Sequence, residues 1–156
     1  MTREHTKGRC GKAVAGFVLV LALLAPGIAT DHARAAASQT RRDQMLALTN
    51  EARATHGKAV LDLNAKLSRY ATRHSREMAH SGTLFHTEDL ASKLNGLDWS
   101  MGGENVGVGP SLVDLQDAFM GSKTHRQNIL QKGYDHAAIG IVQSDGELWV
   151  TVIFYG

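Results

Sequence analysis

The chain has 156 residues, 43% of them hydrophobic, a single cysteine and a formal net charge of +2. Five of the 17 Lys and Arg residues and two of the 15 Asp and Glu residues lie in residues 1–37, so the remaining chain carries a net charge of −1. No run of basic residues follows residue 37, and we expect no nucleic-acid partner. The cysteine is Cys10, so residues 38–156 cannot form an internal disulfide and must fold around one hydrophobic core.

The first 37 residues have the pattern of a secretory signal peptide. Four basic residues precede an apolar run at residues 13–25, which a Pro-Gly pair ends. As a helix this run would span roughly 20 Å, short of the roughly 30 Å hydrocarbon core of a bilayer, so a retained anchor is the less favoured alternative. We expect cleavage after Ala37, with Ala35 as second choice. The mature protein, residues 38–156, is then a secreted single domain with no stable membrane span.

Apolar residues at helical spacing predict three longer helices in the mature chain. The first covers residues 39–55, and a short connector follows it. Asn64 is placed to cap a second helix that ends before Gly82. Ser111 is placed to cap a third helix.

The end of the chain predicts a β-hairpin, with strands at residues 138–143 and 147–155 joined by a Ser-Asp-Gly turn. Both faces of the last strand are largely apolar, so both need to be covered by other elements. A third strand is expected near Glu104. We therefore predict an α+β fold, an α-β-α sandwich with a small antiparallel sheet covered by helices on both faces.

Glu104 is the first candidate site residue. In a strand it shares a face with Val106 and Val108, which indicates a buried face. A buried carboxylate needs hydrogen bonds, a cation or a metal, or its pKa shifts until it is neutral. We therefore expect a specific partner for Glu104.

His125 is the candidate partner. Thr124 and Gln127 have the spacing of a helix capping box, which places His125 in the first turn of a helix. The positive end of the helix dipole disfavours imidazolium there, so we expect a neutral imidazole near pH 7 that could act as a ligand.

For two further histidines, a role in the site competes with a simpler structural or surface role. Leu84 and Phe85 are expected to pin the backbone and leave His86 at the mouth of a short helix beginning at Thr87; a surface or capping role for His86 is an equal alternative. His74 lies on the apolar stripe of the second helix. We interpret it as a core histidine that bonds to a carbonyl, and we leave it out of the site.

Six short motifs, taken together and in order, carry a family resemblance. They are Asn50–Arg53, His74–Met78, Phe85–Thr87, Gly103–Val106, Ser122–Leu130 and Ile139–Ile141. Over nearly all of residues 41–155 the chain resembles the CAP superfamily of cysteine-rich secretory, antigen 5 and pathogenesis-related 1 proteins, in its disulfide-free bacterial branch.

The resemblance implies an α-β-α sandwich with a cleft of two histidines and acidic residues that is associated with divalent metal binding. The matching metal-site positions are His86, Glu104 and His125. Where many members have a second glutamate, this chain has Ser122. Two imidazoles and one carboxylate suit zinc with an open coordination position, so zinc is the expected cation.

Three functions follow from these residues. The first is a secreted, monomeric binding module that holds a divalent cation, a lipid or sterol, or another extracellular or cell-envelope ligand without turnover. The second is a metal-dependent, peptidase-like hydrolase, in which Glu104 and His125 would be the catalytic residues; the sequence lacks HExxH, GxSxG and SxxK motifs, which weakens this alternative. The third is a purely structural His/Glu network.

Overall fold

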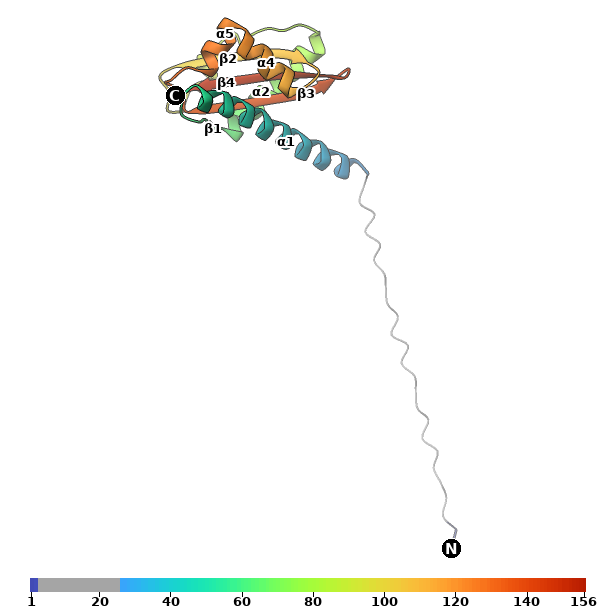
Figure 1. The fold of residues 1–156 in the computed structure, drawn as a ribbon. Helices are drawn as coiled ribbons and strands as arrows, with labels where there is room; N and C mark the ends of the chain where they lie inside the picture. Colours follow the sequence, from blue (N-terminus) through green and yellow to red (C-terminus); the bar gives the residue numbers. More distant parts are fainter. Residues whose placement is uncertain (3–25) are drawn as a thin grey trace.

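The computed structural model describes residues 1–2 and 26–156 (Figure 1). The apolar run at residues 13–25 lies outside the described residues. Within the described part of the chain, no helix is both long and apolar enough to cross a membrane. Every described residue of the hydrophobic core lies between Met45 and Tyr155, so the folded domain is contained in the predicted mature chain.

Five helices surround the sheet, and their ends follow local chemistry. They are α1 (Pro26–Thr55), α2 (Ala65–Ser81), α3 (Leu90–Leu94), α4 (Leu112–Gly121) and α5 (Lys123–Ile129). The predicted bounds of α2 are confirmed: the Asn64 side chain accepts from the Leu67 N–H, and Gly82 adopts a left-handed conformation. The α1 helix begins well before Gln39, so it extends through the expected cleavage site (Figure 1).

The sheet has four strands in the order β1-β3-β4-β2. Its strands are β1 (Asp62–Leu63), β2 (Gly102–Gly109), β3 (His136–Ser144) and β4 (Glu147–Tyr155). The predicted hairpin is confirmed, and its turn at Asp145 and Gly146 has positive φ angles. The predicted antiparallel sheet is present in β2, β3 and β4, and a fourth strand, β1, adds to it by pairing parallel to β3. This two-residue strand lies in the expected connector and is too short to give a periodic signal.

Helices cover both faces of the sheet, as the apolar faces of the last strand predicted. One core joins α1, α4 and α5 to the face that includes Val150, Val152 and Phe154. A second core joins α2 and α3 to the face that includes Ile153 and Tyr155. The α-β-α sandwich is therefore confirmed.

Gly140 allows α2 to lie directly on β3. A Cβ atom at this position would lie 2.0 Å from the carbonyl carbon of Ala71 and 2.2 Å from the amide nitrogen of Thr72. Both are backbone atoms, so the helix as a whole would have to move. We expect Gly140→Ala to lower the free energy of unfolding by about 2 to 3 kcal/mol, the upper range for overpacking.

Urea denaturation measures this effect, with Gly121→Ala as the matched control. At Gly121 an added Cβ would have no neighbouring atom within 4 Å. A Gly140→Ala variant with the same unfolding midpoint as the control would contradict the close packing of α2 on β3.

Candidate ligand-binding site

Glu104 lies on the edge strand of the sheet and is buried. The β2 strand pairs with β4, and Glu104 stands opposite Ile153, so its side chain points to the face that α2 and α3 cover. Glu104 is 8% exposed, and Val106 on the same face is 7% exposed. The predicted burial of this carboxylate is confirmed.

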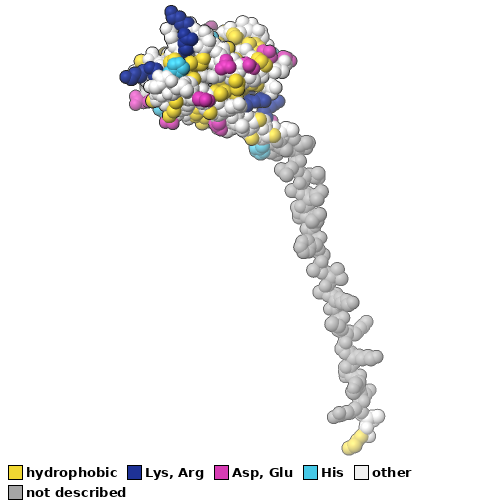
Figure 2. Space-filling view, in the orientation of Figure 1, with side chains coloured by type: hydrophobic (Ala, Val, Ile, Leu, Met, Phe, Trp, Pro, Cys, Tyr) yellow, Lys and Arg dark blue, Asp and Glu magenta, His cyan; other side chains and the backbone are white. Residues whose placement is uncertain are grey.

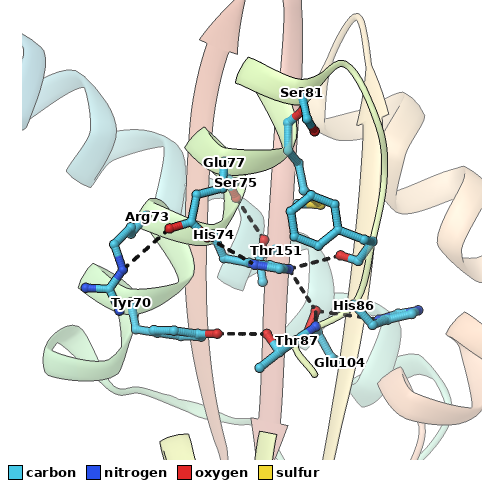
Figure 3. Close-up of polar contacts among 12 residues, drawn as sticks. Tyr70, Arg73, His74, Ser75, Glu77, Ser81, His86, Thr87, Glu104 and Thr151 are labelled. Atoms are coloured by element: carbon cyan, nitrogen blue, oxygen red, sulfur yellow. Dashed lines mark hydrogen bonds and ion pairs between the residues drawn. The ribbon is translucent and has the colours of Figure 1, made fainter. Parts of the chain in front are cut away.

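The carboxylate has three neighbours that hold it in place (Figure 3). The Thr87 backbone N–H donates to both Glu104 oxygens, at 3.1 and 3.3 Å. His86 Nδ1 lies 3.5 Å and His74 Nε2 3.6 Å from Glu104 Oε1, close enough for ion pairing whenever an imidazole is protonated. Glu104 thus has the specific partners that its burial demands.

His74 is the site residue that sequence reasoning left out. It is 2% exposed, and its Nε2 lies 3.0 Å from the Phe85 carbonyl oxygen, as the interpretation of a core histidine predicted. Its ring packs edge-on against the Phe85 ring at 5.0 Å. The second contact, to Glu104, depends on how β2 is placed beneath α2, and its only sequence signal is the position of His74 on the inner stripe of that helix.

His86 is held by its neighbours in the chain, although its own side chain is 61% exposed. Leu84 and Phe85, which were expected to pin this segment, are 42% and 40% exposed, and the Phe85 ring packs against His74. The polar contacts of Phe85 and Thr87 fix the backbone on either side of His86. The short helix also begins later than expected, at Leu90, with Asp89 as its cap.

His125 approaches from the other side of the sheet. Its helix α5 begins at Lys123 with Ser122 at the N-cap, so the capping box predicted at Thr124 is wrong; α5 starts immediately where α4 ends. His125 still lies in the first turn. The Asn105 side chain donates to its carbonyl at 3.0 Å, and its ring packs against the Phe119 ring at 5.1 Å.

The pKa of His125 is lowered from 6.5, first by burial and then by the positive charge of His86. A lowered pKa favours the neutral form of the imidazole, which agrees in direction with the expectation from the sequence. The cause differs from the helix dipole proposed from the sequence. Because the charge of His86 acts on His125, the two imidazoles lie within electrostatic range of each other.

His125 therefore gives a titration test. We expect its pKa, followed by NMR of the ring protons, to lie below 6.5 and to rise partway towards 6.5 in His86→Ala. Between the lowered pKa of His125 in the folded chain and its ordinary pKa of about 6.5 in the unfolded chain, the unfolded chain binds more protons. His125 therefore lowers the free energy of unfolding as the pH falls below about 6.5. An unchanged His125 pKa in the variant would contradict the coupling.

The three predicted metal-site residues are only partly brought together. A carboxylate and two imidazoles are suitable zinc ligands in their chemistry. Within residues 1–2 and 26–156, however, no group of three or more His, Cys, Asp or Glu side chains is placed to hold a metal ion. Glu104 and helix α5 lie on opposite faces of β2, so the arrangement does not fit a complete metal centre. Zinc binding stays a prediction.

Comparisons with known proteins agree with this architecture. Residues 46–154 match the family model "CAP: Cysteine-rich secretory protein family". The Bacillus subtilis membrane protein YlbC is 26% identical over 129 residues, 76% of this chain and 36% of that protein. The chain spans less than half the length of the curated relatives it matches.

Solved bacterial structures have the same fold. An extracellular SCP-domain protein from Bacillus anthracis superposes with a TM-score of 0.67 at 21% identity, over 76% of this chain and 41% of that chain. A cysteine-rich secretory protein from Staphylococcus aureus superposes with a TM-score of 0.63 at 28% identity, over 76% of this chain and 39% of that chain. With the matched family model covering most of the domain, the chain belongs to the CAP family of cysteine-rich secretory proteins.

Proposed function

We propose that this CAP domain is a secreted binding module that holds its ligand at His86 and His125 without turning it over. The observation that supports this most is the state of Glu104. Its two oxygens accept the Thr87 N–H, its Oε1 lies near both His86 and His74, and the side chain is buried. The carboxylate therefore holds the site together from the buried side with His74, while the His86 imidazole is exposed and that of His125 is partly exposed.

The same arrangement argues against the hydrolase alternative. A general base has to reach the proton that it removes, directly or through one water. Glu104 is buried, and its two oxygens already share one backbone donor, the Thr87 N–H. The geometry thus favours a positioning role for Glu104 over proton abstraction.

The surroundings of the histidines indicate the class of ligand. Leu84 and Phe85 are partly exposed directly beside His86, whereas Phe119, against which the His125 ring packs, is buried. A ligand at this edge would meet hydrogen-bonding nitrogen atoms next to apolar side chains. An amphipathic molecule of the cell envelope, of the lipid or sterol class, fits this combination best.

Secretion is supported by two independent observations. Residues 1–37 have the order of charge, apolar run and small residues that signal peptidase substrates share. The Bacillus anthracis relative is an extracellular protein. We expect the exported protein to begin at Ser38; the relation to a membrane protein makes retention at the envelope the alternative destination.

The absence of turnover can be tested directly. We expect purified residues 38–156 to leave peptide, ester and glycan substrates unchanged beyond the blank rate, with and without added zinc. The control is His125→Ala, which removes one imidazole from an incompletely buried position. Turnover that the wild type shows and His125→Ala loses would refute a non-catalytic role.

A further inference from the structure

A groove of about 840 Å³ lies along β3 between α1 and α2, towards the opposite edge of the sheet from the His/Glu site. Five arginines line it, together with one acidic residue, Asp31. From α1 come Arg34, Arg41 and Arg42, and from α2 come Arg69 and Arg76. We call the cleft lined by these five side chains the arginine groove.

Helical spacing turns the arginines of each helix to one side. On α2, Arg69 and Arg76 are seven residues apart, as are Arg34 and Arg41 on α1, and residues at this spacing share a helix face. Both helices contact β3, so the two basic faces border the same strand. Figure 2 shows a group of Lys or Arg side chains close to the point where α1 leaves the body of the domain.

The guanidinium groups have unused hydrogen-bond donors. Arg34, Arg69 and Arg76 have no hydrogen bond or ion pair with any residue that the structure describes. One terminal nitrogen of Arg42 donates a hydrogen bond to the Gln39 side chain. Its buried Nε has no hydrogen-bond acceptor among the residues that the structure describes. Buried donors in folded proteins nearly always find an acceptor, so this one calls for an explanation.

The floor of the groove is an open strand edge. The β1 strand pairs with β3 at His136 and Ala137, and in the part of the chain that the structure describes no strand borders the later residues of β3 on this side. The Ile139 N–H donates to the Ser68 hydroxyl at 3.0 Å instead of to a strand carbonyl. Alternation along an antiparallel strand then directs the Ile141 N–H to the same edge, where Ile141 lines the groove.

We propose that the arginine groove is a second ligand site that binds a phosphate group. Planar guanidinium groups pair with phosphate oxygens in a bidentate manner, and a single carboxylate at the rim leaves the excess charge strongly positive. The site is independent of the His/Glu site in residues and in position. Four of the five arginines follow Ala37, so they stay in the chain after the expected cleavage.

Isothermal titration calorimetry of residues 38–156, which keep four of the five arginines, with sodium pyrophosphate tests the proposal. The groove variant is Arg69→Gln/Arg76→Gln, in which both side chains are exposed and make no described contact. The matched control is Arg73→Gln/Lys93→Gln, which removes the same charge beside the Tyr70 ring, outside the groove. We expect the groove variant to weaken binding at least about tenfold and the control to change it less than about twofold.

A second arm distinguishes the source of the phosphate. Co-sedimentation with phosphatidic acid vesicles, compared with phosphatidylcholine vesicles, tests a lipid headgroup. The site is supported if the protein binds pyrophosphate or phosphatidic acid and only the groove variant loses this binding. The probe that binds then identifies the source of the phosphate, free or on a lipid. His86→Ala/His125→Ala should leave this binding unchanged. No saturable binding to either probe, or an equal loss in the groove variant and the control, would overturn the proposal.

Discussion

Arg53→Ala is expected to lower the free energy of unfolding by on the order of 5 kcal/mol, enough to unfold a marginally stable domain. Arg53 is fully buried, yet its guanidinium donates to four backbone carbonyls. Its Nε reaches the Ala59 oxygen at 2.7 Å, its Nη1 the Ile129 and Gln131 oxygens at 2.7 and 2.9 Å, and its Nη2 the Tyr134 oxygen at 2.9 Å. Truncation would leave these acceptors without their donor.

These bonds join segments that are far apart in the sequence. They tie the end of α1 to the connector before β1, to the end of α5 and to the loop before β3. The Ile129 carbonyl belongs to the last turn of α5, where helix carbonyls lack partners and a positive charge is favourable. Arg53 therefore helps to position the helix that carries His125.

Urea denaturation of Arg53→Lys separates geometry from charge. Lysine keeps the charge but has a single nitrogen, which cannot reach four carbonyls in the directions that a guanidinium allows. We expect Arg53→Lys to lose at least about 2 kcal/mol, and the exposed Arg73→Gln to lose less than about 0.5 kcal/mol. If Arg53→Lys were as stable as the wild type, the four bonds would not carry the stability assigned to them.

Glu104→Gln is expected to lower the free energy of unfolding by about 3 kcal/mol. The carboxylate offers only acceptors to a site that points donors at it: the Thr87 N–H, with His74 and His86 beside it. An amide has the same shape but replaces one acceptor oxygen with an NH₂ donor. The groups that donate to one of the carboxylate oxygens would then face the NH₂ group, which is also a donor, in a buried environment.

His86, the exposed neighbour of Glu104, tests whether ligand binding and stability depend on different residues. His86 is 61% exposed, and exposed ion pairs contribute little. We expect His86→Ala to change the unfolding midpoint in urea only slightly while it weakens ligand binding. We assign a stabilising role to Glu104 and a ligand-binding role to His86. This assignment would be contradicted if Glu104→Gln were as stable as the wild type, or if His86→Ala lost as much stability as Glu104→Gln.

Local signals predicted much of the fold. The cap at Asn64 and the left-handed Gly82 define α2, since each depends on residues within one or two turns. The apolar character of both faces of β4 predicted helices on both sides of the sheet, because each face must be buried. Alternation along β2 likewise predicted that Glu104 is buried.

The remaining features depend on contacts between distant segments. The pairing of Asp62 with His136 rests on two residues, which is below the length at which a pattern can be recognised. The contact of His74 with Glu104 requires the placement of α2 over the edge strand. The arginine groove combines two helix faces that each look like ordinary solvent-exposed surface in the sequence.

The most direct test of the account is NMR of the histidine rings in residues 38–156, titrated separately with a monomeric short-chain phospholipid and with zinc chloride. We predict that the His86 and His125 resonances shift together and saturate with the phospholipid, while those of the exposed His56 and His80 stay unchanged. Saturation of the same two rings with zinc would support the predicted cation. If neither probe moves them, the His/Glu set is a structural network and the proposed binding function is contradicted.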